Sequence, residues 1–436
     1  MNQDRNHPTQ SGSMRPFLTI WTGQIFSLLG SELVQFALVW WLTTTTGSAT
    51  VLALATMMAV LPRVFVSPIA GVLIDRWNRR VVMMLADGLS ALAVVLLAVL
   101  FAFDAVQVWH IYALMFIRAA CGAFHWPAMQ ASTSLMVPER HLARVAGLNQ
   151  ALPALGTIVA PPLGALLLEV LPLQSILAID VGTALLAITP LFFVHVPQPD
   201  RVAAAEGASR PSMVADLREA LHFLRGWPGL LMVVVIGALV NLLIFPAISL
   251  QPLLVTEHFG GDALHLAWLQ SSFGLGMVAG GITLGAWGGF KRRALTGLLA
   301  LALNGVGLVV VGLTPASAFP LAVGGMFLAW FMNPIANGSL FALLQTIVPA
   351  DMQGRVFTLL QSATGAMVPL GLAIAGPLAD VVGVRIWFLV AGLAMIVMGV
   401  GALFVPAIMR VEDAVAGELE GAATTGEPAP VPATAR

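Results

Sequence analysis

Long apolar runs alternate with short polar connections along almost the whole chain. A helix needs roughly 20 mostly apolar residues to cross about 30 Å of hydrocarbon, and twelve runs are long enough. Because polar or turn-forming residues bound each run, each predicts one membrane-spanning helix. The predicted spans are 16–43, 50–73, 81–103, 108–131, 143–168, 172–195, 229–254, 263–287, 294–313, 318–347, 356–379 and 384–405.

The polar stretches divide the chain into five predicted regions. In the stretch between the sixth and seventh spans, Ser212 can cap a helix that places Leu221 and Leu224 on one face. Such an amphipathic helix is typical of a membrane surface. The regions are a disordered N-terminus (1–14), a six-helix bundle (15–196), a linker with the amphipathic helix (197–228), a second six-helix bundle (229–410) and a disordered tail (411–436).

Composition supports the membrane assignment. Of the 436 residues, 58% are hydrophobic and 9% are charged, and the mean hydropathy is +0.92, whereas about 25% of the residues of a soluble domain are charged. Arg15 leads directly into the first run without a small-residue cleavage site, so we expect an uncleaved first span. The sequence therefore predicts an all-α, multi-pass membrane protein.

Motifs for several other chemistries are missing from the sequence. No Gly-x-x-x-x-Gly-Lys-Ser/Thr loop occurs, which excludes a P-loop nucleotide-driven motor. A single cysteine, Cys121, excludes an internal disulfide and a thiolate metal cluster. No histidine pair has the spacing of a helical zinc site. We expect no cofactor, no metal ion and no nucleic-acid partner.

The basic residues predict an orientation. Positively charged connections remain on the cytoplasmic side of a membrane, and alternate connections hold nearly all of the 20 Lys and Arg residues. Arg63 and Arg118 instead fall inside spans, and Arg385 falls on the opposite face. An even number of spans then places both termini in the cytoplasm, in a multi-pass plasma-membrane protein.

The two halves of the chain resemble each other. A near-constant offset of about half the membrane domain predicts two parallel six-helix repeats, related by an axis along the membrane normal. A shift of about 211 residues lays Val137-Pro138, Arg144-Val145 and Gln150 on Val348-Pro349, Arg355-Val356 and Gln361.

Three motifs lie in or beside the first five spans. The loop after span two reads Gly71-Val-Leu-Ile-Asp-Arg-Trp-Asn-Arg-Arg80, and span four contains Arg118-x-x-x-Gly122. Span five reads Gly156-x-x-x-Ala160-Pro161-x-x-Gly164. Together these motifs resemble those of the major facilitator superfamily, and within it the drug:proton antiporters that include macrolide efflux proteins. The chain differs at Asn78 and at two alanines of span five, where the family has glycine.

The resemblance implies the major facilitator fold, with twelve transmembrane helices in two six-helix repeats, and transport by alternating access. It implies a cytoplasmic gate that holds that side shut when the cavity opens outward; the alternative is that the arginines only fix topology. The family associates the span-five motif with antiport, and its physical content is a close-packing seam with a proline hinge. The implied gate residues are Gly71, Asp75, Arg76, Arg79 and Arg80.

Three ionisable residues, Glu32, Arg118 and Asp180, lie inside spans at similar predicted depths of about 20 to 24 Å. Charges inside hydrocarbon are costly, so each requires a partner. In the superfamily fold spans one and four face the cavity and span six is peripheral, which favours Glu32 with Arg118 as the proton-coupling pair. Static ion pairing is the alternative for Glu32 and for Asp180. Arg63 is expected to reach towards Asp87, in a structural role.

Span one also has a polar stripe of Gln24, Ser27, Ser31 and Gln35, which predicts a cavity lining or contacts between helices. If spans seven and ten face the cavity as in the family, they complete a lining suited to an apolar, partly polar ligand. The predicted cavity residues are Gln24, Ser31, Gln35, Asn241, Phe245, Asn333, Asn337 and Phe341.

We expect a monomeric secondary transporter that exports a moderately lipophilic small molecule, of drug or macrolide type, in exchange for protons. Its expected partners are this small molecule, protons and membrane lipids. A rival within the transporters is an exporter or flippase of a siderophore-like metabolite or a lysolipid. A rival from another class is an integral membrane enzyme, for which His125 is the candidate side chain, without an apparent partner at matching depth.

Overall fold

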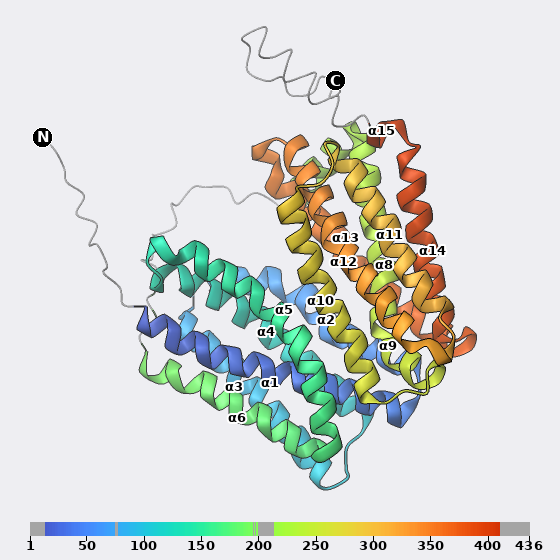
Figure 1. Cartoon of the computed structure of the whole chain (residues 1–436). Coiled ribbons are helices and arrows are strands. Elements are labelled where there is room, and N and C mark those ends of the chain that lie inside the picture. The colour runs from blue at the N-terminus through green and yellow to red at the C-terminus, as the bar shows by residue number, and fades with distance from the viewer. Residues whose placement is uncertain (1–13, 75–76, 195, 197, 199–212, 410–436) are drawn as a thin grey trace, which may run out of the picture. The chain divides into compact units, whose positions relative to one another are not determined.

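The computed structural model describes residues 14–74, 77–194, 196, 198 and 213–409 (Figure 1). Helices and short connections make up this described part, in which no strand occurs. Contacts divide the chain into two compact units. Unit 1 comprises Met1–Leu38 and Met58–Ala204, and unit 2 comprises Val39–Met57 and Ala205–Arg436.

Unit 1 contains most of α1 and α2 and all of the next four helices. Helix α3 packs against both α4 and α6. A buried cluster that includes Phe17, Ile20, Met83 and Leu191 joins the ends of several of these helices. The helices are α1 (Arg15–Thr46), α2 (Ala49–Ile74), α3 (Arg79–Ala102), α4 (Val108–Met136), α5 (Glu139–Val170) and α6 (Leu173–Phe193).

Unit 2 contains the remaining elements, whose long helices run side by side (Figure 1). Helix α11 packs against α12 and α14, and α8 packs against α13. The elements are α7 (Met213–Gly226), α8 (Pro228–Ser249), α9 (Gln251–Leu253), the π-helix η1 (Leu254–His258), α10 (Ala263–Trp287), α11 (Arg293–Leu313), the 3-10 helix η2 (Ala316–Ala318), α12 (Phe319–Ile347), α13 (Ala350–Val382), α14 (Val384–Leu403) and α15 (Pro406–Met409).

Close packing in unit 2 depends on small residues where two helices meet. A Cβ atom on Gly305 of α11 would lie 2.4 Å from the carbonyl oxygen of Gly392 on α14. A Cβ atom on Gly392 would lie 2.6 Å from the carbonyl oxygen of Gly305. Small residues allow such backbone approach between membrane helices. The α11–α14 contact therefore requires glycine on both sides.

Side-chain caps fix two helix starts. Asn78 accepts hydrogen bonds from the backbone N–H groups of Arg80 and Val81 at the start of α3. Asp262 and His265 form a capping box at the start of α10. The hydrogen bond from His265 is the main cause that lowers the pKa of Asp262. Both caps satisfy N–H groups that a helix start leaves without an intrahelical partner.

The predicted linker helix is present as α7, while its predicted cap, Ser212, lies outside the described residues. Ala220 and Leu224 are buried in a cluster with residues of α8 and α13. Glu219 of α7 accepts a hydrogen bond from Arg355 of α13 at 2.8 Å. The apolar face that predicted a membrane-surface helix thus contacts protein.

The segment Val39–Met57, which joins α1 to α2, belongs to unit 2 by its contacts; we call it the hairpin segment. The Asp380 carboxylate of α13 accepts hydrogen bonds from the Ala49 N–H at 2.6 Å and the Thr50 N–H at 3.1 Å. It also accepts from the hydroxyls of Thr50 at 2.5 Å and Ser48 at 3.2 Å. A carboxylate at a helix N-terminus is favoured by the helix dipole. Asp380 therefore caps α2 from a distant part of the sequence.

Two further interactions involve the hairpin segment or its capping residue, Asp380. The hydroxyls of Thr56 and Ser249 are 2.7 Å apart. Burial, and next the nearby charge of Asp380, raise the pKa of Glu257 in η1. The hairpin segment is thus attached to α8 and α13, beside an acidic pair.

Local geometry repeats at positions related by the sequence offset. Pro138 and Pro349 both precede the first residue of a long helix, α5 and α13. Arg79 donates to the carbonyl oxygen of Ala131 on α4 at 2.8 Å. Arg293 donates to the carbonyl oxygen of Ala342 on α12 at 2.9 Å.

Ten helices among the described residues are long and apolar enough to cross a membrane. Helices α4 and α10, which coincide with two predicted spans, are not among the ten. Helix α4 carries Arg118 and His125, and polar side chains of this kind lower the mean hydropathy of a helix. The all-helical membrane architecture is confirmed, and the number of twelve spans stays a prediction.

Candidate transport site

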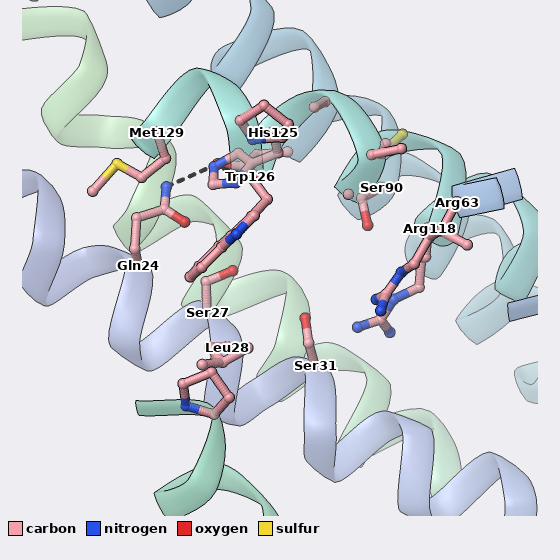
Figure 2. Close-up of a pocket in the computed structure, with 18 of the residues that line it drawn as sticks. Gln24, Ser27, Leu28, Ser31, Arg63, Ser90, Arg118, His125, Trp126 and Met129 are labelled. Carbon is pink, nitrogen blue, oxygen red and sulfur yellow. Dashed lines mark hydrogen bonds and ion pairs between the residues drawn. The ribbon is translucent and has the colours of Figure 1, made fainter. Parts of the chain in front are cut away.

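Unit 1 contains a partly open cavity of about 670 Å³, lined by side chains of α1 to α5. In Figure 2, Gln24, His125, Trp126 and Met129 lie at one end of it. Arg63 and Arg118 lie at the other end, with the α1 serines between. We call these the Gln24 end and the arginine end. This size is ordinary for a small-molecule site.

Helix α1 presents a polar face to the cavity. Gln24, Ser27, Ser31 and Gln35 all line it, as does the flanking Glu32. Their spacing of three and four residues places these side chains on one side of a helix with 3.6 residues per turn. The predicted cavity residues of span one are therefore brought together.

Glu32 lines the arginine end without a close ionic partner. Arg118 and Arg63 are the cations whose charges act on it. No hydrogen bond or ion pair joins Glu32 to another described residue. A Cβ atom on Gly156 of α5 would lie 3.5 Å from Glu32 Cγ, so the antiporter-like motif passes directly beside this side chain.

Arg118 contacts Asp180, which corrects the predicted pairing with Glu32. An Arg118 nitrogen lies 3.3 Å from Asp180 Oδ2, with exposed side-chain fractions of 16% and 6%. Ser31 donates a hydrogen bond to Asp180 Oδ1 at 3.3 Å. Asp180 of α6 thus approaches α1 and α4, although span six was expected to be peripheral. The close approach at Gly30 permits this, since a Cβ atom there would lie 3.0 Å from Asp180 Oδ1.

Asp87 lies at the Gln24 end and has other partners than the predicted Arg63. Gln24 Nε2 donates a hydrogen bond to Asp87 Oδ2 at 3.1 Å. His125 Nε2 lies 3.4 Å from Asp87 Oδ1. The sequence interpretation missed this trio. The sequence did contain a signal, namely similar depth in the membrane. Asp87 lies a few turns after the start of α3, and His125 lies a few turns before the end of α4, which runs antiparallel to α3.

The span-five motif forms a seam between α5 and α1. A Cβ atom on Gly164 would lie 2.7 Å from the Phe36 ring. Ala160 is 2% exposed, and Pro161 lies inside the helix. The small residues therefore permit close contact with the helix that carries Glu32.

The predicted gate residues are only partly described. Gly71 lies in α2, and Asp75 and Arg76 lie outside the described residues. Arg79 is 8% exposed and donates to Ala131. Arg80 donates to the carbonyl oxygens of Leu191 and Phe192 at the end of α6. These two arginines connect helix ends within unit 1.

The remaining predicted cavity residues lie in unit 2. Asn241 on α8 donates to the Gly237 carbonyl at 2.9 Å. Asn337 donates to Asn333 Oδ1 at 3.0 Å, one turn away on α12. Phe341 stacks on Phe357, with ring centroids 4.7 Å apart. Phe245 lies on α8, near its end.

Two other features bear on chemistry. Cys121 lines the cavity from α4 and is 8% exposed. Across the described part of the chain, no group of three His, Cys, Asp or Glu side chains is arranged to hold a metal ion. The polar groups of the cavity are carboxylates, guanidinium groups, an imidazole and neutral amides or hydroxyls, which can bind a small molecule and exchange protons.

Comparison with known proteins identifies the family. The sequence pattern of the Major Facilitator Superfamily matches residues 20–251, more than half of the chain. The chain belongs to the Major Facilitator Superfamily. It is 34% identical to Macrolide efflux protein A of Streptococcus pyogenes over 385 residues, 88% of this chain and 94% of that protein. It is 29% identical to the multidrug efflux pump Tap of Mycolicibacterium fortuitum over 412 residues, 91% of this chain and 97% of the pump.

Solved structures share the fold of this superfamily member at low sequence identity. The nucleoside transporter NupG superposes with a TM-score of 0.65 and 13% identity, over 89% of this chain and 98% of that one. A bacterial homologue of the iron transporter ferroportin, in an inward-facing state, gives a TM-score of 0.65 and 14% identity, over 90% and 99%. The protein is a multi-pass membrane transporter with a major facilitator fold.

Proposed function

We propose that this superfamily member exports a moderately lipophilic small molecule, of macrolide or other drug type, in exchange for protons. The relatives named as macrolide and multidrug efflux proteins support this substrate class. The mixed polar and apolar lining of the unit 1 cavity supports binding of such a molecule. Substrate contacts are proposed for Gln24, Ser31 and Gln35, and the unit 2 residues stay predicted contributors.

The proposal includes the finer architecture. Twelve spans in two parallel six-helix repeats, a monomer and two cytoplasmic termini are all proposed. The repeated arginine-to-carbonyl contacts of Arg79 and Arg293 support the repeat. The cytoplasmic gate is proposed from the loop motif, and the contacts of Arg79 and Arg80 with helix ends are compatible with it.

Glu32 is the proposed proton carrier, and the main support for this role is its position. It lines the cavity, where water and substrate can reach it, and it has no close ionic partner among the described residues. Arg118 is already paired with Asp180, so Glu32 is the carboxyl that is free to change its charge. A carboxyl whose proton affinity depends on burial and on nearby cations can couple proton exchange to ligand binding. Asp180 is assigned the supporting role of holding Arg118.

Two alternative functions remain. Export of a siderophore-like metabolite or flipping of a lysolipid would use the same cavity with another ligand. The enzyme rival gains an acid partner for His125, since Asp87 lies 3.4 Å away. Superfamily membership nevertheless favours transport. If the His125–Asp87 pair catalysed hydrolysis or acyl transfer, His125→Ala would abolish turnover and leave ligand binding intact.

Substrate-induced proton flux in proteoliposomes tests the function. A pH dye inside the vesicles reports flux when a macrolide, a siderophore or a lysolipid is added to the full-length protein. We expect flux with the macrolide and at least a tenfold loss in Glu32→Gln. Glu169→Gln makes the same chemical change at an exposed residue of α5 outside the cavity and should behave as the wild type.

Three results separate the alternatives. Flux with the siderophore or lysolipid alone would replace the substrate class. Full macrolide-driven flux in Glu32→Gln would remove the coupling role from this residue. No flux with any of the three compounds would reject proton-coupled export.

A further inference from the structure

A second, smaller cavity of unit 1, of about 260 Å³, lies between the first turns of α1 and α5; we call it the α1–α5 groove. It is lined by Met14, Phe17, Leu18, Trp21, His141, Arg144, Val145 and Leu148. On both helices these residues follow the spacing i, i+3, i+4, i+7, so they lie on one face of each helix. Phe17 and Val145 are buried, whereas Leu18 is 43% exposed and Leu148 is 42% exposed. The groove is therefore mostly apolar, with a buried floor and exposed walls.

Positive charge gathers at one end of the groove, where both helices begin. Helix α1 begins at Arg15, and α5 begins Glu139-Arg-His-Leu-Ala-Arg144, which gives three guanidinium groups against one carboxyl. Arg144 is exposed and makes no hydrogen bond or ion pair with another described residue. The two helix N-termini add positive partial charge at the same end. This end of the groove therefore attracts an anion.

The other end of the groove is apolar and reaches Trp21. This residue lies about 9 Å along α1 from Arg15, at 1.5 Å per residue. Its indole Nε1 donates a hydrogen bond to Asn149 Oδ1 at 2.8 Å. Trp21 and Asn149 also line the larger cavity of unit 1, so Trp21 is a wall that the groove and the cavity share. A ligand with an anionic head and an apolar body matches the two ends of the groove.

In unit 2 the corresponding place is already occupied. The offset of about 211 residues relates Arg144 to Arg355, which lie near the starts of α5 and α13. Arg355 donates a hydrogen bond to Glu219 of α7 at 2.8 Å. Ala220 and Leu224 of α7 are buried in a cluster with residues of α8 and α13. An acid with an apolar helix face beside it thus covers the start of α13.

The residues before α1 cannot supply such a cover for the α1–α5 groove. Residues 2–13 read Asn-Gln-Asp-Arg-Asn-His-Pro-Thr-Gln-Ser-Gly-Ser and include no hydrophobic side chain. A phospholipid of the surrounding membrane has both an anionic head and an apolar body. Basic pockets between membrane helices on the cytoplasmic side bind anionic lipid headgroups, and the proposed orientation places the starts of α1 and α5 on that side.

We propose that the α1–α5 groove binds an anionic phospholipid, with the phosphate at Arg144 and an acyl chain that runs along Leu18 to Trp21. The lipid takes in unit 1 the place that α7 takes in unit 2. Because Trp21 also lines the larger cavity, the bound lipid supports one wall of the candidate transport site. This site goes beyond the proposed export function and does not depend on which molecule is transported.

A matched pair of lipids tests the charge at Arg144. Native mass spectrometry of the purified full-length protein measures binding of phosphatidylglycerol and of phosphatidylcholine with the same acyl chains. We expect the tightest site to prefer the anionic lipid at least tenfold. Arg144→Gln should remove this preference and change phosphatidylcholine binding less than twofold, while Arg144→Lys should keep it. Arg225→Gln changes an exposed arginine of α7 outside the groove and should match the wild type.

A second pair of variants tests the apolar part of the groove. Leu148→Trp places a larger side chain on its exposed wall and should weaken phosphatidylglycerol binding at least tenfold, although Arg144 is unchanged. Leu155→Trp makes the same change at an exposed position two turns further along α5, outside the groove, and should match the wild type. Equal thermal midpoints of the two variants in lipid-free detergent show that both are folded.

Five results contradict the proposal. Equal binding of the two lipids, or an unchanged preference in Arg144→Gln, would show that Arg144 does not select an anionic lipid. Displacement of phosphatidylglycerol by an equal concentration of glycerol phosphate would make the groove a site for free phosphate. Displacement by a macrolide would make it a substrate site. A dimer that Leu148→Trp dissociates would assign the groove to a second copy of the chain.

Discussion

Arg118 is held at the cavity wall by a partner that does not line the cavity. Its guanidinium contacts Asp180, which Ser31 also contacts. Removing one member of a buried ion pair leaves an uncompensated charge, which is strongly destabilising. We infer that Asp180 keeps Arg118 in position, while Glu32 remains available for proton exchange.

This division of roles between Asp180 and Glu32 predicts that replacing each acid by its amide affects stability differently. Asp180→Asn should lower stability by about 3 kcal/mol, because Arg118 loses its counter-charge. The measurement is the thermal midpoint of the purified protein in detergent, compared with Glu32→Gln, which should change it little. The double variant Asp180→Asn with Arg118→Met should regain most of the stability but not transport. A thermal midpoint lowered equally by Glu32→Gln would contradict the division.

At the residue scale, the sequence placed the ionisable groups inside spans but assigned wrong partners to them. Residue counting gives depth along a helix, and on that basis the sequence grouped Glu32, Arg118 and Asp180 in one layer. It does not give the direction in which a side chain points or which helix is the neighbour. Side-chain direction and the choice of neighbouring helix depend on how the helices pack, as at the close approach of Gly30. The sequence pattern does not encode this packing. The same reason explains the missed Asp87–His125 contact.

At the element scale, the contact between α5 and α1 is set by small residues. Gly164 lies against Phe36, and Gly156 lies against Glu32. The two glycines belong to one motif, but their surroundings differ. A Cβ atom at Gly164 would lie 2.7 Å from the buried Phe36 ring, whereas one at Gly156 would lie 3.5 Å from Glu32 Cγ, an ordinary contact distance. The motif thus contains one position, Gly156, at which a methyl group fits and one, Gly164, at which it does not.

Alanine substitutions make this difference measurable. Gly164→Ala should cost about 1 to 3 kcal/mol, because a methyl group must displace a packed ring. Gly156→Ala should be near neutral in stability and is the matched control. Both are compared by thermal midpoint and by macrolide-driven flux. Equal tolerance at the two positions would contradict the seam.

At the scale of the whole molecule, α1 and α2 each run through both units. Their connection, the hairpin segment, belongs to unit 2, in which Asp380 caps α2, and the rest of both helices belongs to unit 1. Ser48, Ala49 and Thr50 all donate to this one carboxylate. The attachment therefore depends strongly on the negative charge of one side chain.

Hydrogen exchange tests this attachment. Asp380→Asn keeps the shape of the side chain but removes the charge that the α2 N-terminus favours. We expect roughly five- to tenfold faster exchange of the amides at Ala49 and Thr50, since losing a cap costs about 1 kcal/mol. Asp262→Asn changes the cap of α10 and should leave those amides unchanged. Unaltered exchange in Asp380→Asn would show that the segment is held by other contacts.

Cys121 gives the cavity a native chemical reporter. It is the only cysteine of the chain, and it lines the cavity beside Arg118 and Gly122. Most transporters must first be stripped of their other thiols before one position can be labelled, but this chain needs no such editing. Any thiol label that the unaltered protein takes up therefore reports on this one position, with every transport residue in its natural form.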